Sequence, residues 1–475
     1  MKDRTMCPTG QSRSESYRLL IYGNEATKIF VVRTSTGHKL PSVTVATGSR
    51  IAAEINKVTA DTWGLQTYCM FTVPQPLSPN VQSRYVVLES AHSVQGPSYA
   101  GHWQDVTRLG PGDFEHPDDF AAIRKSLDTL HSHSVCPIGG AFGAPGVFRK
   151  VTEWIKSQAA TVGLRLTGPF RQLNGGMTFS LVRFETDGAA LWFKAVGEPN
   201  LREYGITLEL CTDFSDFVPQ LVASQSDWNA WLTTEVDGNH PDEKSSLEVW
   251  IRVIAQMAVL QSRSFGRVLH LIDAGCHDLR VSTLMKVLDP FMDVMSVLMR
   301  TQIATSPAPL SQAELSPLRT QLRDALAILA DSGIPEAISH LDLNPRNVLV
   351  SQKRCVFLDW ARGAVSHPVF SLQHLLDHLK QLHTLKNSWQ RELVSAYIAA
   401  LGFHVGNECW LDSLEVAPLL TVFAIAVATE DWFKAACGDR QSDSARYLRG
   451  LARRMKREAD TWSARRNQWS MPCQL

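Results

Sequence analysis

The last third of the chain carries oxygen-bearing side chains at a spacing that suits phosphate chemistry. His340, Asp342 and Asn347 form the pattern His-x-Asp-x4-Asn, and Asp359 follows after two short apolar runs. Phosphoryl transfer needs an aligned acceptor hydroxyl and cations that neutralise charge on the phosphates. Asp342 can orient the hydroxyl and accept its proton, while Asn347 and Asp359 offer the hard oxygen ligands that Mg²⁺ prefers. His340 is expected to brace the loop rather than to react.

The elements around these residues are predicted to hold them together. Val348–Val350 and Cys355–Leu358 have the apolar pattern of strands, and the turn Ser351–Arg354 joins them into a hairpin that ends at Asp359. Such a hairpin places the three oxygen-bearing side chains near one mouth. The alternative is a buried hairpin with incidental polar residues.

A glycine-containing turn lies further upstream, where a nucleotide-dependent transfer needs a loop over the phosphates. Gly175 and Gly176 would let backbone N–H groups approach phosphates closely, and Thr178 and Ser180 could add hydroxyl contacts. A glycine pair is also what an ordinary hairpin turn uses, so the turn alone does not decide between the two.

A lysine occupies the centre of an apolar strand that follows this turn. Strands are predicted at Phe179–Glu185 and Ala190–Val196, and Lys194 lies within the second. Burying an ammonium group is costly unless it is paired. The alternative is an edge lysine whose charged end reaches solvent.

The segment His340–Trp360 resembles the catalytic hairpin of the aminoglycoside phosphotransferase and choline kinase superfamily, relatives of the protein kinases. In that superfamily Asp-Trp or Asp-Phe often replaces the protein-kinase Asp-Phe-Gly, as Asp359-Trp360 does here. The stretch from Gly363 to Leu372 resembles the short turn into a helix that follows. The resemblance covers about residues 165–400. It implies a bilobal α+β fold, with a small β-rich lobe and a large helical lobe, and it implies ATP or GTP with Mg²⁺ as cofactors.

The same resemblance implies roles for residues before the hairpin. Lys194 matches the lysine that holds nucleotide phosphates, and Glu203 on the following helix matches the glutamate that pairs with it, with Glu209 as the competitor. The strand that ends near Asp237-Gly238 resembles the connector between lobes. By that resemblance, backbone groups of Thr234 and Val236 would contact the base.

Three regions are expected along the chain: an α/β domain over residues 1–148, a β-rich lobe over 149–238 and a helical lobe over 239–475. Residues 17–110 faintly resemble a Nudix-type sandwich, in which the metal-binding acidic run would fall near Val58, Asp61 and Thr62. Of these, Asp61 alone is acidic, and one carboxylate does not build a multi-ligand Mg²⁺ site. Such a domain is therefore predicted to lack hydrolytic activity and to dock a ligand, a partner or the lobe behind it.

Other features have plainer interpretations. His374 and His378 lie one helical turn apart, a spacing that can bind zinc, but a helix with two packed or exposed histidines is favoured. His131, His133 and Cys136 beside a Pro/Gly loop lack an evident fourth ligand. The basic stretch 447–466 is expected to be a solvated terminal helix whose apolar side packs on the domain.

Composition limits the partners. Lys plus Arg and Asp plus Glu each total 47, which gives no argument for broad nucleic-acid binding. Nine dispersed cysteines favour a reducing compartment, and a cytoplasmic location is expected. The apolar stretch 416–428 is expected to be a buried helix too short to cross a bilayer, which needs about 20 residues, so no membrane partner is expected.

The function favoured is ATP-dependent phosphate transfer to a hydroxyl of a small molecule. A protein acceptor is disfavoured, since little chain lies between Asp359 and Pro368 to build a peptide platform. A non-catalytic nucleotide-binding pseudokinase or scaffold is the alternative. A metal-dependent hydrolase using His374 and His378 is a third hypothesis. Protein partners remain open.

Overall fold

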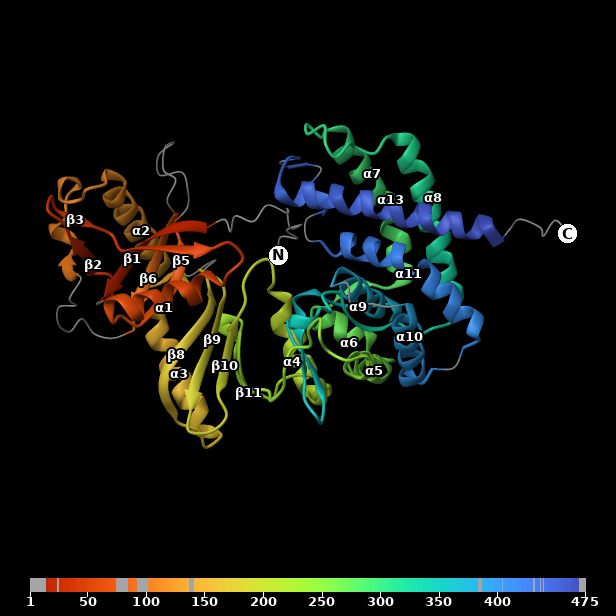
Figure 1. The fold of residues 1–475 in the computed structure, drawn as a ribbon, viewed down its shortest axis with the longest axis horizontal. Coiled ribbons are helices and arrows are strands. Elements are labelled where there is room, and N and C mark those ends of the chain that lie inside the picture. Colours follow the sequence, from red (N-terminus) through yellow and green to blue (C-terminus); the bar gives the residue numbers. More distant parts are fainter. Residues whose placement is uncertain are drawn as a thin grey trace. The chain divides into compact units, whose positions relative to one another are not determined.

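A computed structural model describes residues 14–23, 25–73, 84–91, 101–135, 141–382, 387–403, 405–429, 432–435, 437–438 and 440–469. The chain divides into two compact units (Figure 1). The first comprises residues 1–204 and 220–235, and the second comprises residues 205–219 and 236–475.

The first unit begins with a seven-stranded mixed sheet. Its main path runs β3-β2-β1-β6-β5, with β4 paired to β1 and β7 to β2, and β1 runs parallel to β6. The strands are β1 (Ser14–Gly23), β2 (Lys28–Arg33), β3 (His38–Lys39), β4 (Ser42–Ala46), β5 (Thr67–Thr72), β6 (Arg84–Ser90) and β7 (His102–Asp105). Helices α1 (Ile51–Trp63) and α2 (Pro117–Val135) accompany the sheet, and α1 ends at Gly64, whose φ of 65° is the left-handed value that favours glycine there.

A five-stranded antiparallel sheet follows in the same unit, in the order β11-β12-β10-β9-β8. Its strands are β8 (Leu166–Gly175), β9 (Ser180–Thr186), β10 (Leu191–Ala195), β11 (Leu221–Gln225) and β12 (Ala230–Thr234). Helix α3 (Val147–Thr161) precedes the sheet, and helix α4 (Arg202–Asp213) follows β10. The two strands predicted at residues 179–185 and 190–196, the second of which carries Lys194, are confirmed as β9 and β10.

The two sheets of the first unit share one hydrophobic core. Tyr68 and Val87 of the first sheet belong to the same buried cluster as Phe184 and Phe193 of the second. Phe148 of α3 lies between aromatic rings of both, with ring centroids 4.4 Å from Tyr68 and 4.2 Å from Phe170. The boundary predicted at residue 148 therefore falls inside a continuous core.

The second unit is mostly helical. Its helices are α5 (Leu247–Ser264), α6 (Val268–Asp273), α7 (Val281–Arg300), α8 (Gln312–Asp331), α9 (Val369–Gln381), α10 (Asn387–Leu401), α11 (Asn407–Val427), α12 (Trp432–Ala435) and α13 (Asp443–Trp469). A three-stranded sheet has the order β13 (His277–Leu279), β17 (Gly363–Ser366) and β14 (Ala337–His340), and β15 (Val348–Val350) pairs with β16 (Cys355–Phe357). The α+β fold class predicted from the sequence is confirmed.

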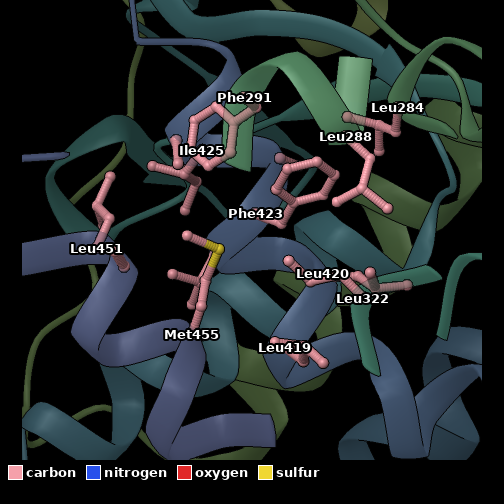
Figure 2. Packing of buried hydrophobic residues seen from close by; sticks show 14 of the residues in the cluster. Leu284, Leu288, Phe291, Leu322, Leu419, Leu420, Phe423, Ile425, Leu451 and Met455 are labelled. Carbon is pink, nitrogen blue, oxygen red and sulfur yellow. The ribbon is translucent and has the colours of Figure 1, made fainter. Parts of the chain in front are cut away.

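Figure 2 shows the larger core of this unit, in which side chains of four helices meet. Phe291 of α7 lies edge-on to Phe423 of α11, with ring centroids 5.4 Å apart, and Met455 of α13 belongs to the same cluster. Helix α11 is longer than the apolar stretch predicted at residues 416–428, and residues 408–427 have the length and composition of a membrane span. Of this window, 67% is buried inside the protein, as in a core helix.

Candidate functional site

Polar side chains within residues 338–360, the segment predicted to be catalytic and called the catalytic loop below, hold that segment in its fold. Strand β14 ends at His340, a single 3-10 turn covers Pro345–Asn347, and the hairpin β15–β16 follows. The side chain of Asn344 caps that turn by accepting the N–H of Arg346 at 2.9 Å. The N–H of Leu358 donates to the carbonyl of Asn347 at 2.8 Å, so these two residues face each other at the open end of the hairpin. Asp359 is the residue that follows Leu358. The predicted hairpin is confirmed.

Asp342 is held by two amide side chains. Asn344 Nδ2 donates to its Oδ1 at 3.1 Å, and Asn347 Nδ2 donates to its Oδ2 at 3.2 Å and to its backbone carbonyl at 2.9 Å. Burial alone would raise the pKa of the Asp342 carboxyl, but the His374 and His340 imidazoles and the Asn344 amide lower it to about 2. Asp342 is therefore ionised at neutral pH and is fixed to accept a hydrogen bond.

His340 is buried and supports the loop. Its Nδ1 accepts the N–H of Asp342 at 3.2 Å, and its Nε2 donates to the carbonyl of Leu358 at 2.9 Å. Burial lowers the pKa of His340, which keeps the imidazole neutral. These contacts agree with the expected bracing role.

Asn347 and Asp359 have the donor chemistry that a hard cation requires. The amide nitrogen of Asn347 is turned to Asp342, so the amide oxygen points away from the nitrogen's contacts with Asp342. Asp359 is exposed and has a left-handed backbone with φ of 62°. Amide and carboxylate oxygens at the hairpin mouth fit Mg²⁺.

The segment after Asp359 contains a strand that the sequence did not reveal. Gly363–Ser366 was expected to form a turn into a helix, but it forms β17, which lies antiparallel to β14 and parallel to β13. Helix α9 then begins at Val369. Ser371 on α9 accepts the N–H of His340 at 3.0 Å, which fastens the helix to the start of the catalytic loop.

This attachment brings two histidines that looked incidental in the sequence close to Asp342. His374 Nε2 lies 3.9 Å from Oδ1 of Asp342 and 3.2 Å from Nε2 of His378. The spacing of the two histidines in the sequence predicted that they lie together. It did not predict that His374 lies close to Asp342, because that depends on the contact between α9 and β14.

Lys194 and Glu203 form an ion pair within the first unit. Lys194 Nζ lies 2.5 Å from Oε1 of Glu203, whose side chain is 2% exposed. The competitor Glu209 instead lies 3.5 Å from Arg267, within the second unit. The choice of Glu203 over Glu209 as the partner of Lys194 agrees with these contacts.

The glycine turn packs against the first sheet at Gly175. A Cβ on Gly175 would come 2.6 Å from the carbonyl oxygen of Cys69, so the lack of a side chain there serves the contact between β8 and β5. Gln172 reinforces that contact, with its amide bonded to both the N–H and the carbonyl of Cys69 at 2.7 and 2.9 Å. The approach of the Gly175 N–H to phosphates stays a prediction.

Other residues of this turn are also engaged. The hydroxyl of Ser180 is buried and accepts a hydrogen bond from Tyr68 at 2.8 Å, and its predicted contact with phosphate stays a prediction. Gly176 donates its N–H to the carbonyl of Phe179 at 3.0 Å and is buried. Thr178 is half-buried, and its role stays a prediction.

The connector residues have different surroundings. Thr234 donates its N–H to the carbonyl of Gln220 at 3.0 Å, and its predicted backbone contact with a base stays a prediction. Further along, Asn239 exchanges two backbone hydrogen bonds with Val350 at 3.0 and 2.9 Å, which fastens the connector to β15. The contact predicted for Val236 stays a prediction.

Among the described residues of the N-terminal sheet and its helices, no group of three His, Cys, Asp or Glu side chains lies close enough to hold a metal ion. Asp61 is exposed at the end of α1. The Nudix-like resemblance stays a prediction, and Cys136 of the predicted loop lies outside the described residues, as does the placement of the His133 side chain.

Comparisons with known proteins locate the family. No curated protein matches the chain. Solved structures similar to it include choline kinase LicA from Streptococcus pneumoniae, at 14% identity over 66% of this chain and 99% of that one, with a TM-score of 0.43. Another is macrolide 2'-phosphotransferase MphH from Brachybacterium faecium, at 18% identity over 61% and 97%, with a TM-score of 0.39. A choline/ethanolamine kinase family protein from Mesorhizobium loti has 15% identity over 66% and 98%, with a TM-score of 0.43.

A family model matches residues 170–411, just over half of the chain. The match includes Lys194, Glu203 and the whole catalytic loop, and it agrees with the range of about 165–400 expected from the resemblance. The chain belongs to the phosphotransferase enzyme family.

Proposed function

We propose that this protein transfers the γ-phosphate of ATP or GTP to a hydroxyl group of a small molecule. The observation that carries the proposal is the fixed carboxylate of Asp342, held between the amides of Asn344 and Asn347 and braced from behind by His340. Membership of the phosphotransferase enzyme family supports it.

Asp342 would act mainly by orienting the acceptor. A carboxyl with a pKa of about 2 is a weak base at neutral pH, since general bases work best when their pKa lies near the working pH. Its fixed oxygens can still align a hydroxyl for in-line attack and take its proton late in the transfer. Asn347 and Asp359 would hold Mg²⁺, which neutralises phosphate charge when bound.

Lys194 would position the nucleotide phosphates, with Glu203 fixing the direction of its ammonium group. Gly175, Gly176, Thr178 and Ser180 of the glycine turn stay candidates for contact with phosphate. The carbonyl of Thr234 and the N–H of Val236 stay candidates for contact with the base. A cytoplasmic location belongs to the same proposal.

The test is a screen of nucleotide consumption and product mass over amino sugars, amino alcohols and nucleosides, with ATP and GTP each supplied with Mg²⁺. Asp342→Asn should lower turnover by roughly 10²–10⁴-fold. Asp324→Asn, at an exposed position on α8, is the matched control and should leave turnover unchanged. Binding of nucleotide without turnover across the panel would favour the non-catalytic alternative.

A further inference from the structure

Three side chains able to bind a metal ion meet beside the catalytic loop. One ring nitrogen of His374, one ring nitrogen of His378 and a carboxylate oxygen of Asp342 lie within 4.8 Å of one another. We propose that they bind a divalent transition-metal ion such as Zn²⁺, and that this ion blocks phosphate transfer by occupying the carboxylate of Asp342. The blocking rests on the proposed function, whereas the binding does not.

The two histidines are presented by a rigid element. They are four residues apart on α9, so they share one face of the helix, and their ring centroids are 4.7 Å apart. The opposite face is anchored by buried residues that include Leu372, Leu375 and Leu379. Helix residues fixed by packing hold ligands more accurately than loop residues do.

The third ligand is fixed to the same helix. Ser371, one turn before His374, accepts the N–H of His340, and Asp342 follows two residues later. Gln261 strengthens the attachment, because its amide donates to the carbonyls of Ile338 and Pro368, each at 3.1 Å. The separation between Asp342 and the histidine pair is therefore set by buried hydrogen bonds.

Two of the three ligand separations are close to those around a small tetrahedral ion, and the third, between His378 and Asp342, is within 4.8 Å. Zinc bonds of about 2.0–2.1 Å separate adjacent ligand atoms by about 3.3 Å. The 3.2 Å between the two Nε2 atoms meets this value, and the 3.9 Å from His374 to Asp342 needs a shift of about half an ångström. Without a metal, the short separation of the nitrogens is that of an N–H···N hydrogen bond, which is the competing interpretation.

The ligand types favour zinc over the magnesium that phosphate transfer uses. Imidazole nitrogen suits Zn²⁺, Cu²⁺ and Ni²⁺, while Mg²⁺ prefers oxygen ligands. Two imidazoles and one carboxylate leave a fourth position open. The Asp342 side chain is 31% exposed and that of His374 is 14% exposed, so an ion from solvent can reach them.

A bound ion would remove the group that orients the acceptor. Oδ1 of Asp342 already accepts the amide of Asn344, and its remaining lone pair would be taken by the metal. Oδ2 accepts the amide of Asn347, so the hydroxyl of the acceptor would have one lone pair of the carboxylate left, beside a bound cation that weakens it as a hydrogen-bond acceptor. Inhibition should therefore act on turnover and persist at saturating nucleotide.

The binding arm uses the full chain, freed of any histidine tag, titrated with Zn²⁺ and with Co²⁺ in excess Mg²⁺. We expect one ion per chain, with a Co²⁺ spectrum free of the thiolate charge-transfer band that exposed Cys437 would give. His374→Gln and His378→Gln should each weaken binding at least roughly tenfold, as should Asp342→Asn. His270→Gln, at an exposed position on α6, should not.

The turnover arm compares each variant with and without Zn²⁺, and thermal unfolding checks that each is folded. Zinc should inhibit the unmodified chain reversibly on addition of a chelator, and His378→Gln should be at least roughly tenfold less sensitive. Absence of stoichiometric binding, or binding that both histidine variants retain, overturns the proposal. If no acceptor is phosphorylated, the proposed function fails while the binding result stands; zinc binding without inhibition overturns the blocking role alone.

Discussion

Nε2 of His340 lies 2.9 Å from the carbonyl oxygen of Leu358, and this contact ties the beginning of the catalytic loop to the end of its hairpin. The other ring nitrogen accepts the N–H of Asp342. One neutral imidazole thus fixes the backbone on both sides of the loop.

Replacing His340 should therefore affect the geometry of Asp342 as well as stability. His340→Leu leaves the buried carbonyl of Leu358 and the N–H of Asp342 without this partner, at a cost of about 1–3 kcal/mol of unfolding free energy. We expect His340→Leu to lower kcat by a larger factor than it changes KM. We expect His340→Asn to keep part of the kcat that His340→Leu loses. Urea unfolding and steady-state kinetics measure both; an unchanged kcat in a destabilised His340→Leu variant would contradict a positioning role.

The Lys194–Glu203 pair allows stability to be separated from activity. Lys194→Met leaves the carboxylate of Glu203, which is 2% exposed, without its neighbouring ammonium, and should cost about 3–5 kcal/mol of unfolding free energy. The double variant with Glu203→Met should recover most of that stability and no phosphate transfer.

The control for this pair is Arg263→Met, which breaks an exposed ion pair with Asp216 and should change stability by about 1 kcal/mol or less. Phosphate transfer in the double variant at the level of the unmodified chain would show that Lys194 has no role in holding the nucleotide.

Gly175 distinguishes a packing role from a role in nucleotide binding. In Gly175→Ala the new methyl group meets the carbonyl of Cys69, so we expect destabilisation of about 1–3 kcal/mol. Gly112→Ala, where nothing lies within 4 Å, should be nearly neutral. Chemical unfolding gives the comparison, and a stable Gly175→Ala variant with a raised KM for nucleotide would restore the phosphate interpretation.

His367 should make the protein sensitive to acid. Complete burial lowers its pKa from 6.5 to about 3, so between these values the unfolded chain binds a proton that the folded chain does not. Stability from this group is complete above pH 6.5 and is lost as pH falls toward 3, with a slope of at most about 1.4 kcal/mol per pH unit.

The measurement is the unfolding free energy at a series of pH values. His367→Leu should flatten the acid limb relative to the unmodified chain, whereas His116→Leu, at an exposed position, should leave its slope unchanged. Parallel acid limbs for the unmodified chain and His367→Leu would exclude this residue as the cause.

The catalytic hairpin could be predicted because its determinants are local. Apolar triplets, a turn and the residue that ends the second strand all lie within the loop, and β15 and β16 follow that pattern. The pairing of Lys194 with Glu203 could also be predicted. A helix follows the apolar strand closely in the sequence, so only the position of each residue along these two elements decides whether they meet.

What escaped prediction depends on contacts between distant segments. Strand β17 pairs in parallel with β13, which lies far earlier in the chain. The residues of β17 alone do not indicate that such a partner exists. The contact between Tyr68 and Ser180 requires the packing of two sheets, so Ser180 looked like an available hydroxyl. His374 looked incidental for the same reason, because only the attachment of α9 to β14 brings it to Asp342.

The core shared by the two sheets of the first unit sets a limit on truncation. A fragment that begins at residue 170, where the family match starts, loses Phe148, Val151 and Ile155 of α3 and leaves Phe184 and Phe193 facing water. Stripping a core of this size removes several kcal/mol per aromatic side chain, which exceeds the margin of an ordinary domain. The leading 150 or so residues are thus needed for stable folding of the sheet that carries Lys194, and a fragment without them should be poorly folded on expression.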